Sequence, residues 1–157
     1  MDAMTDQEES QFSLTDARRT AMDLLARREH SVLELRRKLA KRDMSGEVAE
    51  QALQGLVADG LLDESRFAES FVSSRISKGQ GPVRIRGDLS ERGVAGELVE
   101  QALESTDCDW FELARQVRAR RFGPEAPGDY PERARQSRFL QYRGFSSEQI
   151  RFAVGDN

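Results

Sequence analysis

The side chains in this sequence that are best suited to chemistry are basic residues that recur at matching places along the chain. Arginine predominates among them, and its planar guanidinium can form paired hydrogen bonds with carboxylates and phosphates. The candidate binding residues are Arg36, Arg37, Lys38, Arg84, Arg86, Arg92, Arg115, Arg118, Arg133, Arg135 and Arg138, with Lys41, Arg42, Arg120 and Arg143 nearby. If the segments that carry them stack, these residues form a basic stripe for an anionic partner. The alternative is an ordinary solvated face whose arginines pair with neighbouring carboxylates.

Two further arginines, Arg75 and Arg121, interrupt apolar helix faces at matching positions. The arc around the first consists of Phe67, Ala68, Phe71, Val72 and Ile76. A charge inside such an arc is costly unless it is paired or its head reaches water. We therefore predict that both arginines are structural and close buried pairs that fix helix docking, with Asp63, Glu64 or Asp88 as the partner of Arg75. The alternative is a guanidinium exposed to a ligand.

Residue types that would support catalysis or a metal centre are scarce. The sequence has one cysteine, Cys108, and one histidine, His30, which leaves no thiol pair for a disulfide and too few ligands for a usual zinc site. It also lacks a phosphate loop after a strand and a Ser/His/Asp order. The segment GQGP at residues 79–82 is interpreted as a joint between two helices, since no strand leads into it. We expect neither an enzyme nor a bound cofactor.

A repeat of about fifty residues positions these side chains. Three similar segments read LAKRDMSGEVAEQAL from Leu39, LSERGVAGELVEQAL from Leu89 and LQYRGFSSEQIRFAV from Leu140. Apolar residues recur at helical spacing in each unit, and nothing alternates with period two, so strands are not expected. Each unit resolves into three short helices, which bury their faces poorly alone and should stack on their neighbours. The predicted fold is all-α, an elongated, curved array of three tandem three-helix repeats.

The expected domain boundaries follow from this repeat. Residues 1–16 form an acidic leader that is expected to be disordered, and the three repeats occupy residues 17–62, 63–106 and 107–157. Helix starts are predicted at Thr15 or Asp16, at Ser31 with Glu34 as a capping box, at Ser45, at Asp63, at Asp107 or Asp109, and at Ser146 with Gln149 as a second box.

Composition and charge set further limits. Of 157 residues, 38% are hydrophobic and 33% charged, which favours slender, solvent-rich helices over one thick core. No apolar run has membrane length and the first residues lack the features of a signal peptide, so a cytoplasmic protein without membrane contact is expected. The net charge is −4, but the leader contributes five acidic residues and no basic ones. The remainder of the chain is therefore close to neutral.

Several of these segments resemble the RecX regulatory proteins of bacteria. The similarity rests on DESRFAESFVSSRISKGQGPVRIRGDLSERGV at residues 63–94, on the overlapping ALQGLVADGLLDE, and on LQYRGFSSEQIRFAV at residues 140–154. The resemblance implies tandem three-helix repeats that bind in the helical groove of the RecA recombinase filament on single-stranded DNA. It also implies a regulatory role in recombination, DNA repair and the SOS response, usually by inhibition of strand exchange, ATP hydrolysis and co-protease activity. The third repeat departs from the pattern, because Gln136 stands where the others have Leu35 and Ile85.

The nearly zero net charge of the chain without its leader limits the kind of partner that it can bind. So weak a field predicts only weak direct binding to free DNA, so that selectivity for the nucleoprotein filament must come from shape and paired contacts. An alternative is direct duplex binding of helix-turn-helix type through Arg84 and Arg86, and a third is a generic helical adaptor. The third helices carry acidic and apolar residues that would repel phosphates, which disfavours a recognition helix there. A monomer is expected, because the array needs no second chain to close its core.

Overall fold

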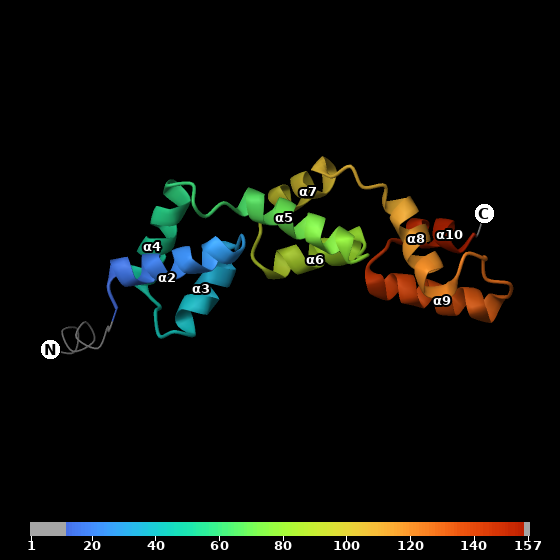
Figure 1. The fold of residues 1–157 in the computed structure, drawn as a ribbon, viewed down its shortest axis with the longest axis horizontal. Helices are drawn as coiled ribbons and strands as arrows, with labels where there is room; N and C mark the ends of the chain where they lie inside the picture. Colours follow the sequence, from blue (N-terminus) through green and yellow to red (C-terminus); the bar gives the residue numbers. More distant parts are fainter. Residues whose placement is uncertain (1–11, 156–157) are drawn as a thin grey trace. The chain divides into compact units, whose positions relative to one another are not determined.

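The chain is helical throughout the part that the structure, a computed structural model, describes, which is residues 12–155. Its helices are α2 (Leu14–Arg27), α3 (Val32–Ala40), α4 (Glu47–Ala58), α5 (Glu64–Ser77), α6 (Pro82–Glu91), α7 (Gly96–Ser105), α8 (Trp110–Phe122), α9 (Tyr130–Arg143) and α10 (Ser147–Val154) (Figure 1). No strand occurs within the described range, which confirms the predicted all-α class. The predicted acidic leader falls mainly on residues 1–11, which lie outside the described residues.

The first described helix, α2, begins earlier than the sequence suggested. The Ser13 hydroxyl accepts a hydrogen bond from the Asp16 N–H at 3.1 Å, and the Asp16 carboxylate accepts one from the Ser13 N–H at 2.9 Å. The predicted caps Thr15 and Asp16 are therefore wrong, because this reciprocal box satisfies two N–H groups that a later start would leave open. The hydrogen bonds from the Ser13 backbone and hydroxyl also lower the pKa of Asp16.

Most other helix starts follow the predicted capping chemistry. The capping residues that the structure confirms are Ser31 with Glu34, Asp63, Asp109, and Ser146 with Gln149. Ser45 does not cap α4. The N-cap there is Gly46, whose φ of 88° is a conformation that glycine adopts without strain. The prediction therefore located the start of α4 to within one residue but named the wrong capping residue.

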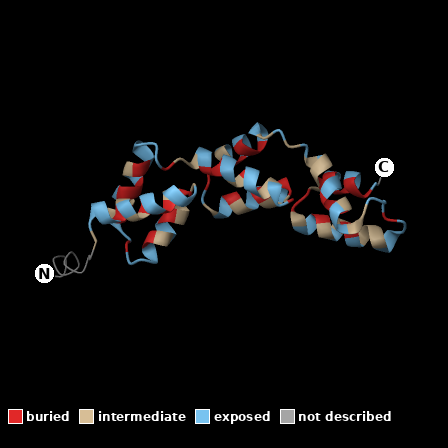
Figure 2. Ribbon diagram, in the orientation of Figure 1, coloured by how far each residue is buried: buried red, intermediate tan, exposed pale blue. Residues whose placement is uncertain are grey.

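The described helices group into two units, which divide between Phe67 and Ala68, within α5. In the first unit α2 packs against α4, and α3 contacts both. Its buried core consists of Ala17, Ala21, Leu24, Leu35, Leu39, Met44, Ala49, Ala52, Leu53, Leu56 and Leu62 (Figure 2). Alanines and leucines make up the buried residues of both α2 and α4, and small side chains at a contact allow two helices to approach closely.

In the second unit α6 packs against α7, while α8 contacts both α9 and α10. The core of the α8, α9 and α10 group is Ala114, Val117, Leu140, Phe145, Ile150, Ala153 and Val154. The buried apolar residues of α6 and α7 are Pro82, Ile85, Leu89, Val99, Ala102 and Leu103. The leucines that begin the three similar sequence segments, Leu39, Leu89 and Leu140, are all fully buried. The repeat in the sequence is therefore a repeat of core positions.

Two glycines join the second repeat to the third inside this unit. The Gly81 N–H donates to the carbonyl of Arg143 at 2.9 Å, and the Val83 N–H donates to the carbonyl of Gly144 at 2.9 Å. A Cβ on Gly81 would overlap the Gly144 carbonyl, and a Cβ on Gly144, whose φ is 98°, would overlap Arg84. The GQGP segment is a helix joint, as predicted, and it is also where two repeats meet backbone to backbone.

Candidate binding surface

Two of the candidate arginines are held by glutamates at the same place in successive repeats. Arg36 on α3 donates through Nε and Nη2 to Glu50 on α4, both at 2.8 Å. Arg86 on α6 donates in the same way to Glu100 on α7, at 2.9 and 3.1 Å. These side-chain hydrogen bonds raise the pKa of each arginine and lower the pKa of each glutamate. The charge of both arginines is thus balanced locally, as the ion-pair alternative supposed.

Arg115 and Arg135 are also paired, each with a glutamate three residues earlier on its own helix. The Arg115 Nε donates to Glu112 at 2.9 Å, and the Arg135 Nε donates to Glu132 at 3.0 Å. Hydrogen bonds from Arg135 and then from Gln136 lower the pKa of Glu132 to about 2. Both pairs lie at the surface, where such contacts contribute little to folding and can exchange for contacts with a partner.

Arg118 does not belong to an exposed basic surface, and its assignment to the stripe is wrong. Its side chain is 3% exposed, and it donates to the Gln136 side chain at 3.1 Å and to the carbonyls of Glu125 and Gly123 at 3.1 and 3.2 Å. A buried guanidinium needs such acceptors to offset its desolvation. Arg118 therefore holds the loop between α8 and α9 against the helices.

Arg121 was predicted to be buried, and here the structure differs in the opposite sense. It is exposed, with its guanidinium 5.6 Å from the centre of the Phe139 ring and 5.7 Å from that of Phe122. The predicted buried pair at this position is wrong, because the loop carbonyls that can satisfy a buried arginine reach Arg118 instead. A helical wheel could not reveal this, since the acceptors belong to an irregular segment outside the helix.

Arg75 has the role of a docking residue. Its Nη1 donates to the Asp88 carboxylate at 2.6 Å and to the Gln80 side chain at 2.8 Å, and its guanidinium lies 4.2 Å from the centre of the Phe71 ring. With 16% of its side chain exposed, it connects the end of α5 to α6. Asp88 was one of the three partners expected for it.

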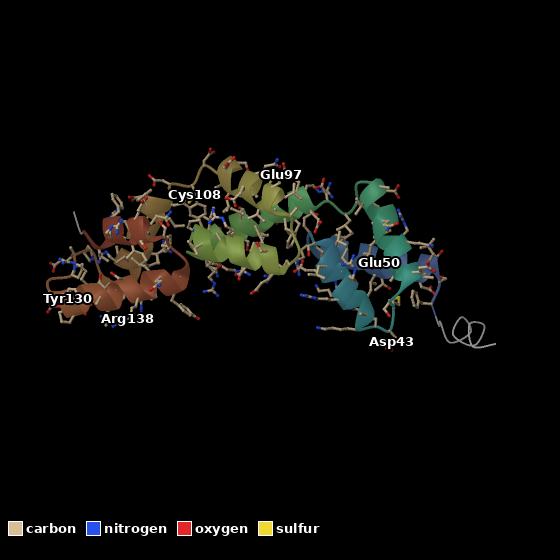
Figure 3. All side chains as sticks on the ribbon, turned by 180° about the vertical axis from the view of Figure 1, so that it is seen from behind. Asp43, Glu50, Glu97, Cys108, Tyr130 and Arg138 are labelled. Carbon is tan, nitrogen blue, oxygen red and sulfur yellow. The ribbon has the colours of Figure 1, made fainter. Side chains whose placement is uncertain are left out.

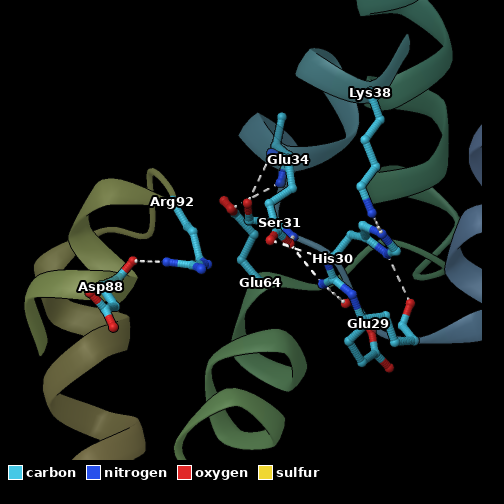
Figure 4. Close-up of polar contacts among 10 residues, drawn as sticks. Glu29, His30, Ser31, Glu34, Lys38, Glu64, Asp88 and Arg92 are labelled. Carbon is cyan, nitrogen blue, oxygen red and sulfur yellow. Dashed lines mark hydrogen bonds and ion pairs between the residues drawn. The ribbon is translucent and has the colours of Figure 1, made fainter. Parts of the chain in front are cut away.

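Three more candidates contact their own repeat. Arg92 donates to the backbone carbonyl of Asp88 at 2.9 Å (Figure 4). Arg84 lies 3.8 Å from the Asp88 carboxylate, and its guanidinium is 5.5 Å from the centre of the Tyr142 ring. Lys38 is considered with His30 below. None of these three is buried, so each retains surface for a partner.

Lys38 and the sole histidine form a polar contact in the first unit. The Lys38 Nζ lies 2.8 Å from Nε2 of His30, and the Nδ1 of His30 lies 3.0 Å from the carbonyl of Arg28 (Figure 4). A proton on Nδ1 donates to that carbonyl, which leaves Nε2 to accept from the ammonium. Burial of His30, at 1% exposure, lowers its pKa and favours this neutral form.

The remaining candidates are Arg37, Arg133 and Arg138. Within residues 12–155, Arg37 and Arg138 are exposed and their side chains have no hydrogen bond or ion pair. Arg138 projects from α9 (Figure 3). Arg133 is half-buried, and its Nε is buried without a hydrogen-bond partner in the described chain. Arg37 and Arg138 are therefore the predicted residues whose charge is most available to a partner.

Comparison with known proteins decides the family. Models of the first, second and third three-helix domains of RecX match residues 17–56, 63–103 and 107–154. The chain belongs to the RecX family. It is 50% identical over 137 residues to the regulatory protein RecX of Halorhodospira halophila, covering 87% of this chain and 85% of that protein. It is 53% identical over 133 residues to the regulatory protein RecX of Pseudomonas syringae pv. tomato, covering 85% and 86%.

The fold agrees with solved RecX structures. The crystal structure of RecX from Lactobacillus salivarius matches with a TM-score of 0.75 at 20% identity, over 91% of this chain and 95% of that one. A second crystal structure of a regulatory protein RecX matches with a TM-score of 0.73 at 24% identity, over 92% of this chain and 74% of that one. At these identities the match shows the fold alone.

The third RecX domain of this chain lacks the arginine–glutamate pair of the other two. In the aligned segments, Ser137 stands where the others have Arg36 and Arg86, and Arg151 stands where they have Glu50 and Glu100. Ser137 and Arg151 line a common open pocket of about 600 Å³ between α9 and α10. Arg151 is exposed and has no ion pair among the residues described. Sequence reasoning missed this residue, although the repeat alignment contained the signal.

An exposed aromatic residue adds to the surface of the same domain. Tyr142 on α9 is 75% exposed and lies under the Arg84 guanidinium. It is one helical turn from Arg138, so the two side chains share a face of α9. No feature of the sequence marks a single tyrosine as exposed. Residues 12–155 contain no group of three or more His, Cys, Asp or Glu side chains that could hold a metal ion.

Among the described helices, none is both long and apolar enough to cross a bilayer.

Proposed function

We propose that this RecX-family chain binds the RecA recombinase filament on single-stranded DNA in its helical groove and inhibits its ATPase, strand-exchange and co-protease activities. Family membership carries the proposal, since three RecX domain models match in order along the chain and the curated relatives are named regulatory proteins. The protein acts by binding in the cytoplasm, as a monomer and without catalysis of its own.

The charge distribution supports a partner that is recognised by shape. The net charge is −4, and at least four candidate arginines are already paired with glutamates of the chain. Such a surface has a weak long-range field, so contacts must form one by one at a fitting surface. Arg37 and Arg138 are the predicted residues best placed to make them.

The test is the single-stranded-DNA-dependent ATPase of the recombinase with the chain added. We expect inhibition at well below one chain per recombinase subunit, because a protein seated in a filament groove touches several subunits. The variants Arg37→Glu and Arg138→Glu should each weaken inhibition by roughly tenfold, as expected for loss of a charged contact. Arg19→Glu, an exposed change of the same charge on α2, is the matched control and should inhibit normally.

The direct DNA-binding alternative gives a different result. A helix-turn-helix protein that reads duplex DNA would bind duplex more tightly than filament and would slow the ATPase only by sequestering DNA. Excess DNA would then relieve the inhibition. An ATPase that is unaffected at equimolar chain would contradict the proposal outright.

A further inference from the structure

Four basic side chains line one small pocket in the second unit, and none of them entered the predicted site as a group. They come from the C-terminal ends of α5, α8 and α9 and are Lys78, Arg120, Arg121 and Arg143. The pocket has a volume of about 280 Å³, and Ser77, Gly79, Val117 and Phe139 complete its lining. No carboxylate lines it.

Two of the four basic side chains, those of Arg121 and Arg143, contact the same aromatic ring. Arg143 donates through Nη1 to the Lys78 carbonyl at 3.0 Å and lies 5.1 Å from the centre of the Phe139 ring. Arg121 lies 5.6 Å from the same ring. Both distances to the ring are within the range of a cation–π contact, which attracts a guanidinium to the ring without using its N–H donors. These contacts keep both guanidiniums beside the pocket.

A glycine keeps the pocket open. Gly79 has a φ of 76°, and a Cβ there would lie 3.0 Å from Val117 and 3.5 Å from the Arg143 guanidinium. A side chain at this position would occupy the space beside Arg143.

The position of each basic residue can be explained separately, but the presence of four of them around one pocket cannot. Arg120 and Arg121 lie in the last turn of α8 and Arg143 in that of α9, where the helix dipole favours cations. That effect accounts for each residue but not for four cations around one pocket, which repel one another. Several other arginines of this chain are paired with glutamates, whereas among the described residues none of these four basic side chains has a carboxylate partner.

We propose that this basic pocket binds a phosphate group. A volume at the lower edge of the range for ligand pockets suits one group rather than a whole large ligand, and forked guanidiniums match phosphate oxygens. The group comes either from a single-stranded nucleic acid or from a nucleotide. The inference deepens the proposed function, since a filament supplies such phosphates, but its test needs no recombinase.

The test uses the full chain and two probes at low salt, a dye-labelled oligothymidylate and a dye-labelled nucleoside triphosphate, followed by fluorescence anisotropy. The variant Lys78→Glu/Arg120→Glu changes two exposed side chains of the pocket. We expect at least roughly tenfold weaker binding of one probe, with a shallower dependence of affinity on salt because fewer phosphates are neutralised. The matched control is Arg19→Glu/Arg27→Glu on α2, which makes the same charge change away from the pocket.

The two probes distinguish a phosphate of a nucleic-acid strand from a phosphate of a free nucleotide. Loss confined to oligothymidylate assigns the site to a nucleic-acid strand, and loss confined to the triphosphate assigns it to a nucleotide. Equal binding by the pocket and control variants, or no binding of either probe by the wild-type chain, would overturn the proposal. If the charge reversals unfold the chain by circular dichroism, Lys78→Gln/Arg120→Gln replaces them, with the same criteria.

The filament ATPase, measured in parallel, keeps the two proposals distinct. Wild-type chain that inhibits the ATPase without a pocket effect on either probe overturns the phosphate site alone. A pocket effect without ATPase inhibition overturns the proposed function alone. Pocket variants that bind both probes normally but no longer inhibit would assign the pocket to an acidic surface of the recombinase, which also overturns the phosphate site.

Discussion

At the scale of single residues, the contact between the second and third repeats depends on glycines that allow two backbones to touch. Gly81 donates its N–H to Arg143, and its missing side chain leaves room for the carbonyl of Gly144. Within α6, Gly87 instead faces open space. The same residue type therefore has opposite consequences at two positions six residues apart in the sequence.

The variant Gly81→Ala should lower the free energy of unfolding by about 2–3 kcal/mol, because the added Cβ forces the backbones apart. Gly87→Ala should raise it by about 0.5–1 kcal/mol, since alanine is the better helix former and nothing obstructs its methyl group. Urea unfolding followed by circular dichroism measures both. Similar effects of the two substitutions would show that the close approach at Gly81 does not matter to stability.

The buried histidine makes a second residue-scale prediction. Burial holds the pKa of His30 below its usual 6.5, so the unfolded chain takes up the proton at a higher pH than the folded one. Stability is therefore present above about pH 6.5 and is lost as the pH falls toward the folded-state value.

Denaturant midpoints compared at about pH 7.5 and pH 5.5 should show this loss in the wild-type chain, and His30→Gln should reduce it. The chain has no other histidine, and the carboxylates whose pKa values are lowered titrate below this window. An unchanged pH dependence in His30→Gln would show that another group is responsible.

At the scale of elements, the third repeat differs from the others in how its second and third helices are tied. Arg36–Glu50 and Arg86–Glu100 connect these helices in the first two repeats. Ser137 and Arg151 at the matching positions leave an open pocket. Where the first two repeats have an arginine–glutamate pair of zero net charge, the third repeat thus has Arg151 without an ion pair among the described residues.

The double variant Ser137→Arg/Arg151→Glu should rebuild the pair. Each single change should be neutral or destabilising, because Ser137→Arg alone places two arginines together and Arg151→Glu alone has no partner. The double variant should recover stability, with a coupling energy of about 0.5–1 kcal/mol in a double-mutant cycle at low salt. Strictly additive effects would mean that the two positions are not equivalent to the pairs in the other repeats.

The helices themselves could be predicted because their determinants are local. Ser31 with Glu34, and Ser146 with Gln149, are short-range signals that act within one turn. The pairing of arginines could not be predicted to the same degree. Arg118 is satisfied by carbonyls of an irregular loop, and Arg121 is exposed beside Phe139, although both occupy the same helix. Which of them is buried depends on contacts that have no fixed spacing in sequence.

At the scale of the whole molecule, three repeats built on one pattern carry unlike surfaces. The first two each tie one second-helix arginine, Arg36 or Arg86, to a glutamate on the third helix, whereas the third lacks this pair and exposes Arg138, Arg151 and Tyr142. The repeat period was plain from Leu39, Leu89 and Leu140, which explains why the fold class could be predicted. The differences between repeats lie at solvent-exposed positions, where packing imposes no pattern.

Selective binding to the recombinase filament is the most direct test of the proposed role. The end-labelled chain is titrated with RecA–oligothymidylate filament, with the bare oligonucleotide and with free recombinase, each at about 50 and 200 mM salt. We predict that the filament binds much more tightly than either component, and that its affinity falls less with salt than that of the bare strand, because shape and paired contacts outweigh counterion release. Equal affinity for filament and bare strand, with equal salt dependence, would contradict the proposed function.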